Sequence, residues 1–471
     1  MMLYLIELCV LLVSGLVLSR SFRYRVMPFI ITAGGLLISP FLITWYLILT
    51  ILYYMKKWKA ARQYGKDVEF LSGADAMYAL PSLDTEENKM VINSYIVLEG
   101  NMNIKNLQDL IQDRLLNPKN KDGEYKYKKL RQELTEYEGY FAWRMEKDFK
   151  VEDHVALLEE NGEPIEYRDD EELAKLIEKE SYKPFPKGKS PWKFTLASRS
   201  MAGVPLYKRD ESFRNECILI CRIHHTLGDG VSFVRMILTS LVDKDLNTPK
   251  FNIPKYTKWN VISAYIWSIA MFSVGMMNLY CHFESNILHG PKLTGKKHFV
   301  WSKPIKIDLI KKIRVIRNVK FNDVVMSCIS GALQRYYRRH GDHRCKDIHC
   351  VIPVALHSLT DEPKLENKFS VVPVNLSMSD MPPTARLEHV KRKFETFKRS
   401  PDILFNYTAV RTFCDTAPEW LCALLFNTTF LATLVASNVP GPVETIAIQG
   451  HKIIRPAFFV PQRGRTGMYT Q

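Results

Sequence analysis

Between Met27 and Met55 the chain carries no charged residue, and this run dictates more about its architecture than any other part of the sequence. A helix that crosses a bilayer needs about 20 predominantly apolar residues, so the run is long enough to span a membrane even when tilted. Residues 1–19 form another apolar run in which Glu7 is the only charge. No basic residue precedes it, which argues against a cleaved signal peptide. We therefore expect residues 1–60 to be an N-terminal membrane anchor of one or two apolar segments.

The rest of the chain has the pattern of a folded α/β protein. The apolar spacing predicts strands at 92–98, 217–223, 348–356 and 369–376 and helices at 107–116, 171–179 and 322–340. Residues 117–131 are rich in charge and predict a surface loop that leads into a helix. A third apolar stretch, 261–283, fits a membrane-dipping helix and a buried core helix equally well, because length alone does not separate them.

The net charge and the cysteines limit which partners and which cellular compartment suit the folded part. The net charge is +15, which suits an anionic membrane surface or a phosphate-bearing small molecule. No zinc-finger, RNA-binding or basic-zipper pattern is present in the sequence, so nucleic acid is the weakest of the charged partners. The nine cysteines are scattered, and several lie in apolar runs, which is typical of reduced, packed thiols. We expect the residues after 56 to lie on the cytosolic side.

Residues 222–230, Arg-Ile-His-His-Thr-Leu-Gly-Asp-Gly, join a buried strand to a helix that begins near Val231. Reactive groups in α/β proteins lie at such strand ends. Histidine has an ordinary pKa near neutrality and suits proton removal from a hydroxyl at pH 7. We expect Asp229 to fix the loop by pairing with an arginine, and Gly228 and Gly230 to permit the backbone angles of a tight turn.

Residue chemistry alone leaves three interpretations of the histidine pair open. The pair is a structural strand end, half of a metal site, or a catalytic base. No third metal ligand lies near it in sequence. A second group of potential ligands fits no standard zinc spacing, so we expect no metal there either: His343, Cys345, His349 and Cys350.

The motif His-His-x-x-x-Asp-Gly at residues 224–230 resembles the active-site signature of the wax ester synthase/diacylglycerol acyltransferase family. That family belongs to the acyl-CoA-dependent acyltransferases built like chloramphenicol acetyltransferase. Further elements of the family pattern follow in order along the chain. They are Ala74-Asp75-Ala76-Met77, residues 90–100, Phe149 to Val155, Ser190-Pro191-Trp192, Asn322-Asp323-Val324-Val325, and Ser437-Asn438-Val439-Pro440-Gly441-Pro442.

The resemblance implies a fold and a set of boundaries. It implies an α/β fold of two sandwiched chloramphenicol acetyltransferase-like halves with a tunnel between them, behind an N-terminal transmembrane region. We expect an N-terminal half at 70–255, a crossover at 256–300 with the apolar, membrane-contacting candidate, and a C-terminal half at 301–471. The family usually continues beyond a Pro-Gln-x-Gly element like that at 461–464 into one more strand. A truncated second half would lack an edge strand.

The resemblance also implies a mechanism and roles for named residues. His225 would take the proton of a bound alcohol, and the alkoxide would attack the acyl-CoA thioester without an acyl-enzyme. His224 would shape the site and Asp229 would hold it. Asn438 and Asn322 would be oxyanion or site-shaping residues, and the motif glycines with Pro440 and Gly441 would be structural. Acyl-CoA is a co-substrate, and no cofactor is implied.

The expected activity is therefore acyl transfer to a long-chain alcohol or diacylglycerol in a eukaryotic membrane, most simply the endoplasmic reticulum, with the lipid droplet and the plasma membrane as alternatives. A sterol or an amine is a rival acceptor. A catalytically inactive lipid-binding or scaffold protein is the rival from another class, favoured by the short C-terminus and disfavoured by the intact motif. Three glycosylation sequons begin at Asn375, Asn406 and Asn427, and glycans there would overturn the cytosolic orientation.

Overall fold

The computed structural model describes most of the folded chain, but not the first apolar run and only the start of the third. The first run, 1–19, and most of the third, 268–283, lie outside the described residues. The described residues are 27–65, 67–80, 90–200, 215–243, 257–264, 266–267, 286–288, 296–301, 305–343, 347–357, 362–399, 402–427, 432–439, 441–442, 444–459, 461 and 468–470.

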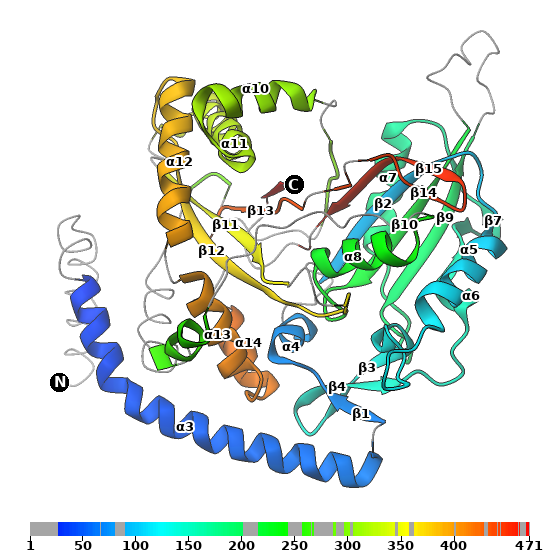
Figure 1. The fold of residues 1–471 in the computed structure, drawn as a ribbon, viewed down its shortest axis with the longest axis horizontal. Helices are drawn as coiled ribbons and strands as arrows, with labels where there is room; N and C mark the ends of the chain where they lie inside the picture. Colours follow the sequence, from blue (N-terminus) through cyan, green and yellow to red (C-terminus); the bar gives the residue numbers. More distant parts are fainter. Residues whose placement is uncertain are drawn as a thin grey trace.

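A long helix, α3 (Met27–Tyr64), comes before the α/β body and contains the charge-free run. Figure 1 shows it extending along one side of the molecule. Within the described residues, Ala33–Tyr64 is the helical stretch long and apolar enough to cross a bilayer. Most of its large apolar side chains are exposed, whereas Leu49, Tyr53 and Ala60 are buried against the body. Large exposed apolar surfaces of this kind mark contact sites for a membrane or for another protein.

The larger of two main sheets has seven strands in the order β14-β15-β2-β10-β9-β5, with β8 also paired to β9. The central strand β10 is buried along nearly its whole length, as predicted for residues 217–223. Two strands from near the C-terminus, β14 and β15, complete the sheet beside β2. The bounds are β2 Val91–Glu99, β5 Val155–Leu157, β8 Glu166–Tyr167, β9 Trp192–Arg199, β10 Glu216–His224, β14 Ala447–Ile448 and β15 His451–Phe459.

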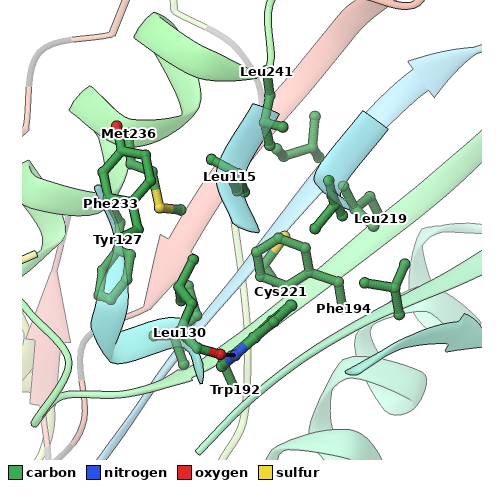
Figure 2. Packing of buried hydrophobic residues seen from close by; sticks show 14 of the residues in the cluster. Leu115, Tyr127, Leu130, Trp192, Phe194, Leu219, Cys221, Phe233, Met236 and Leu241 are labelled. Carbon is green, nitrogen blue, oxygen red and sulfur yellow. Dashed lines mark hydrogen bonds between the residues drawn. The ribbon is translucent and has the colours of Figure 1, made fainter. Parts of the chain in front are cut away.

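Helices on both faces of this sheet bury its apolar side chains. On one face, Figure 2 shows Phe194, Leu219 and Cys221 of the strands packed with Phe233 and Met236 of a helix. A second apolar cluster covers the opposite face. The helices are α5 Ile104–Ile111 with its π-helical extension Gln112–Leu116, α8 Gly230–Ser240, α6 Val151–His154 and, on the other face, α7 Asp170–Ser181. The predicted helices at 107–116 and 171–179 are confirmed.

A small sheet of three strands, in the order β1-β4-β3, lies next to α3. The charged segment 117–131 leads into strand β3 after a short 3-10 helix, Lys128–Arg131, so the helix expected there was wrong. Leu130 is buried and anchors this turn by accepting a 2.8 Å hydrogen bond from Trp192 Nε1 (Figure 2). The bounds are β1 Val68–Phe70, β3 Gln132–Tyr137 and β4 Tyr140–Met145, with α4 Gly73–Ala79 after β1 and the short hairpin β6 Glu159–Glu160 and β7 Glu163–Pro164.

The second main sheet has the order β12-β11-β13-β16 and carries its own apolar core. The strand β16 (Met468–Thr470) pairs in parallel with β13 at the edge of this sheet. The helix predicted at 322–340 is confirmed as α11, and Figure 1 shows α11 and α12 side by side. The bounds are β11 Asp347–Ala355, β12 Phe369–Ser377, β13 Leu434–Ala436, α10 Ile307–Arg317, α11 Phe321–Arg339, α12 Pro383–Arg399, α13 Asp402–Cys414 and α14 Glu419–Asn427.

Candidate active site

His225 follows the last residue of β10 and lies where the two sheets approach each other. Its backbone N–H donates to Met90 O at 2.8 Å, which fixes the chain directly after the strand. The side chain is 7% exposed. The ring of Tyr78, from α4, stacks on the imidazole with the centroids 3.8 Å apart and the planes 11° from parallel. Two short segments far apart in sequence therefore hold the imidazole in one plane.

The hydrogen bonds around Asn367 define which nitrogen of His225 carries the proton. His225 Nδ1 lies 2.9 Å from Asn367 Oδ1. Asn367 Nδ2 donates to Asp75 Oδ1 at 2.8 Å and to His225 O at 2.7 Å, so the amide nitrogen points away from the ring and the amide oxygen toward it. An oxygen that only accepts requires a proton on Nδ1. In the neutral ring the lone pair is then on Nε2, the nitrogen that can act as a base.

Burial keeps this imidazole neutral. It lowers the pKa of His225 to about 4, and the nearby Asp229 carboxylate and the Asn367 hydrogen bond only partly oppose the shift. A neutral, unprotonated base at physiological pH is what proton removal from an alcohol requires.

Asp229 is a buried carboxylate with three hydrogen-bond donors around it. Its Oδ1 accepts the Ser232 N–H at 2.9 Å and caps α8. Its Oδ2 accepts from His357 Nε2 at 2.7 Å and from the Lys368 N–H at 2.9 Å. Burial raises the pKa of Asp229, but the bonds from His357 and the two backbone donors outweigh it and hold that pKa below its ordinary value. The expected arginine partner was wrong, because the pairing group is a histidine brought in by the loop after β11.

Packing explains Gly228, and unusual backbone angles explain neither of the motif glycines. Neither Gly228 nor Gly230 has a positive φ, so the expected reason was wrong. A Cβ on Gly228 would lie 3.1 Å from Glu366 N, whereas one on Gly230 would meet Phe458 at an ordinary 3.5 Å. Gly228 thus permits close approach of the segment that carries Asn367.

His224 is buried beside His225 but points into a different environment. Its Nδ1 lies 2.9 Å from Thr226 Oγ1, and its ring meets the ring of Phe185 edge-on. The strand places successive side chains on opposite faces, so one histidine turns toward the other sheet and its neighbour turns away from it.

The two asparagines named from the sequence meet each other, because Asn438 Nδ2 donates to Asn322 Oδ1 at 2.7 Å. The hydrogen bonds of His225 go to Asn367 and Met90 and to neither of these two. Gly441 is exposed, and Pro440 lies outside the described residues.

Sequence reasoning missed four residues of this site: Asp75, Tyr78, His357 and Asn367. Asp75 lies inside a segment that had been matched to the family pattern, which was a usable signal. The other three gave none, because their contacts join positions more than a hundred residues apart. Among the residues that the structure describes, no three His, Cys, Asp or Glu side chains are grouped as metal ligands.

The fold of this chain is similar to that of a solved protein. The solved wax ester synthase/diacylglycerol acyltransferase from Marinobacter aquaeolei VT8 is similar to 85% of this chain and 89% of its own length, with a TM-score of 0.55 and 18% sequence identity. The chain therefore has the two-lobed α/β fold of that class of enzyme.

Sequence comparisons find similarity to proteins of the same kind. Residues 365–470 match the WS/DGAT C-terminal domain. The chain is 25% identical over 278 residues to the O-acyltransferase WSD of Acinetobacter baylyi, a match covering 51% of this chain and 58% of that protein. It is 24% identical over 375 residues to wax ester synthase/diacylglycerol acyltransferase 2 of Arabidopsis thaliana, covering 69% of this chain and 74% of that protein. The chain is therefore similar in sequence to the wax ester synthase/diacylglycerol acyltransferases, the family whose motifs it resembles.

Proposed function

We propose that this protein transfers a fatty acyl group from acyl-CoA to a lipid hydroxyl, with His225 as the general base. The observation that carries the proposal is the neutral, buried imidazole whose Nδ1 faces an acceptor oxygen, so that Nε2 keeps its lone pair. Within the described residues no hydrogen bond occupies Nε2. The names of the relatives, O-acyltransferase and wax ester synthase/diacylglycerol acyltransferase, support the same chemistry.

The proposed reaction passes through a ternary complex and needs no nucleophilic serine or cysteine. His225 Nε2 takes the hydroxyl proton as the alcohol oxygen attacks the thioester carbonyl carbon. The C–S bond of the tetrahedral intermediate then breaks, and the coenzyme A sulfur takes the proton back from Nε2. The products are one ester and one free coenzyme A, and the imidazole returns to its neutral form.

The remaining motif residues have supporting roles in this proposal. Asp229, bonded to His357 and to the start of α8, holds the loop after His225 in place. His224 and Gly228 shape the same turn. The amide pair of Asn322 and Asn438 is the candidate oxyanion donor, since a developing oxyanion is stabilised by donors fixed before the reaction.

The acceptor distinguishes this proposal from its rivals. We propose a long-chain alcohol or diacylglycerol, which give wax ester and triacylglycerol respectively. The test incubates membranes containing the full chain with labelled palmitoyl-CoA and one acceptor at a time, including a sterol and a long-chain amine. Labelled ester in the wild type but not in His225→Ala supports the proposal and ranks the acceptors. No product from well-folded wild type would favour a lipid-binding or scaffold protein.

We also propose that the protein is membrane-bound through α3. Its exposed apolar residues, such as Leu37, Phe41 and Ile51, support this. The described helical residues after Thr257 bury Ala264 against Thr408 of α13 and expose Trp259, Ile266 and Trp267, which favours bilayer contact over a buried core helix. In this proposal the halves 70–255 and 301–471 lie on the cytosolic side of the endoplasmic reticulum membrane. The crossover 256–300 contacts the membrane from the same side. Glycans on Asn375, Asn406 or Asn427, detected by a mobility shift after glycosidase, would contradict that orientation.

A further inference from the structure

Asp75 is a buried carboxylate that the proposed reaction does not use directly. It is 4% exposed and lies in α4. Its Oδ1 accepts from Asn367 Nδ2 at 2.8 Å and from the Asn367 N–H at 3.3 Å. Its Oδ2 accepts from Lys129 Nζ at 2.8 Å, and that lysine is mostly buried too. Each oxygen therefore has a partner of its own, one an amide and the other a cation.

This arrangement matters because a side-chain amide can turn by 180° and exchange its donor for its acceptor. With its oxygen toward His225, Asn367 selects the ring form protonated at Nδ1. If the amide were turned, its nitrogen would donate to Nδ1 and select the form protonated at Nε2, which cannot take a proton from an alcohol. Something must therefore fix the orientation of Asn367.

We infer that Asp75, neutralised by Lys129, is the positioning residue that fixes Asn367 and thereby keeps His225 Nε2 free to act as the base. An ionised carboxylate only accepts hydrogen bonds, so it can face the Asn367 nitrogen but not the Asn367 oxygen. The carbonyl oxygen of His225 lies 2.7 Å from the same nitrogen and also accepts a hydrogen bond from it, which favours the same orientation of Asn367. Lys129 is the counter-charge that a buried carboxylate needs. The inference rests on the proposed function of His225.

The arrangement also joins parts of the chain that are distant in sequence. Asn367 comes from the segment before β12, in the second half, while Asp75, Lys129 and His225 come from the first. The Asp75 segment is itself fixed to the second half, since the Gly73 N–H donates to Asp415 Oδ1 at 2.6 Å. The base is thus completed only where the two halves are correctly docked.

Replacing Asp75 by asparagine tests the inference, because the change keeps the shape and removes the acceptor-only character. Lys129 will hold the oxygen of the new amide and turn its NH₂ toward Asn367. The Asn367 nitrogen then faces another donor, and its orientation is no longer fixed. We expect kcat to fall about 10- to 100-fold, less than the 10²- to 10⁴-fold expected for loss of a general base, with KM for acyl-CoA unchanged. Asp170→Asn, which weakens an exposed bond to Arg455, is the matched control and should keep full activity.

A second variant gives a readout that a purely structural role would not move. In the double variant Asp75→Asn/Asn367→Asp, which avoids two carboxylates in contact, a carboxylate replaces the amide at Nδ1 and stabilises the protonated ring, so the acidic limb of the kcat/KM profile should move up by about one pH unit or more. Asn375→Asp lies on β12 at a position where no hydrogen bond joins the side chain to His225, so it should leave the limb in place. Measured melting temperatures identify any variant that fails to fold.

The outcomes distinguish failure of the positioning role of Asp75 from failure of the proposed function of His225. Loss of kcat in Asp75→Asn together with the shifted limb in Asp75→Asn/Asn367→Asp would support the positioning role. Full activity in Asp75→Asn, beside an inactive His225→Ala, would overturn the positioning role alone. Full activity in His225→Ala would instead overturn the proposed function.

Discussion

Replacing Asp229 by alanine should destabilise the protein more than an ordinary helix-cap change. The substitution removes the acceptor for three donors at once: the Ser232 and Lys368 N–H groups and His357 Nε2. The lost cap alone costs about 1 kcal/mol. Each of the other buried donors left without its acceptor costs about 1–3 kcal/mol. Because these contributions overlap in one network, we expect a total near 4 kcal/mol rather than their sum.

Asp169 provides the matched comparison. It caps α7 through the N–H groups of Glu171 and Glu172 at an exposed position and touches no buried partner. Asp169→Ala should therefore cost only about 1 kcal/mol. Chemical denaturation of the detergent-solubilised variants, followed by tryptophan fluorescence, measures both changes.

The stability lost in Asp229→Ala should also depend on pH. Because the pKa of Asp229 is lower in the folded than in the unfolded protein, its contribution is full above the ordinary aspartate pKa and is lost as the pH falls through the folded value. The gap between wild type and Asp229→Ala should narrow at strongly acidic pH. A loss below about 1 kcal/mol at neutral pH, no larger than that of Asp169→Ala, would refute the account of this loop.

Two further predictions concern the pH profile of the reaction and the packing of glycines in helices. Since burial lowers the pKa of His225 to about 4, kcat/KM should stay level from roughly pH 8 to pH 5 and decline only near that value; a decline centred near 6.5 would mean that the imidazole is solvated. Gly73→Ala would place a Cβ 2.1 Å from the Cys414 carbonyl carbon, so we expect about 2 kcal/mol or more of destabilisation and reduced activity, because α4 carries Asp75 and Tyr78. Gly331→Ala, whose Cβ would meet only the Arg386 side chain at 3.5 Å inside α11, should be neutral or stabilising by up to about 1 kcal/mol in the same melting assay.

The parts of this protein that could be predicted from its sequence are those determined by residues that are neighbours in the chain. The buried strand β10, the helix α8 and the histidine pair between them follow from local apolar spacing and one short motif. The long α3 helix follows from the absence of charge. The two-lobed fold was predicted through the order of several short motifs rather than through any one of them.

The parts that could not be predicted depend on chain segments meeting in space. Asn367 bonds a ring 142 positions away, and His357 bonds a carboxylate 128 positions away. An arginine seemed the natural partner of Asp229, yet the fold brings a histidine there. Residues 117–131 were predicted to be a surface loop that leads into a helix, but buried Leu130 and the pairing of β3 with β4 limit that helix to a single 3-10 turn.

The central claim, direct transfer by His225 without an acyl-enzyme, is tested by the first turnover of the purified full chain. Palmitoyl-CoA is mixed with enzyme in stoichiometric amount, with and without a long-chain alcohol, and both free coenzyme A and ester are followed over milliseconds to seconds. We predict that coenzyme A and ester appear together, only with the alcohol, and not in His225→Ala. A burst of coenzyme A without the alcohol, accompanied by a palmitoyl mass on the protein, would contradict the claim.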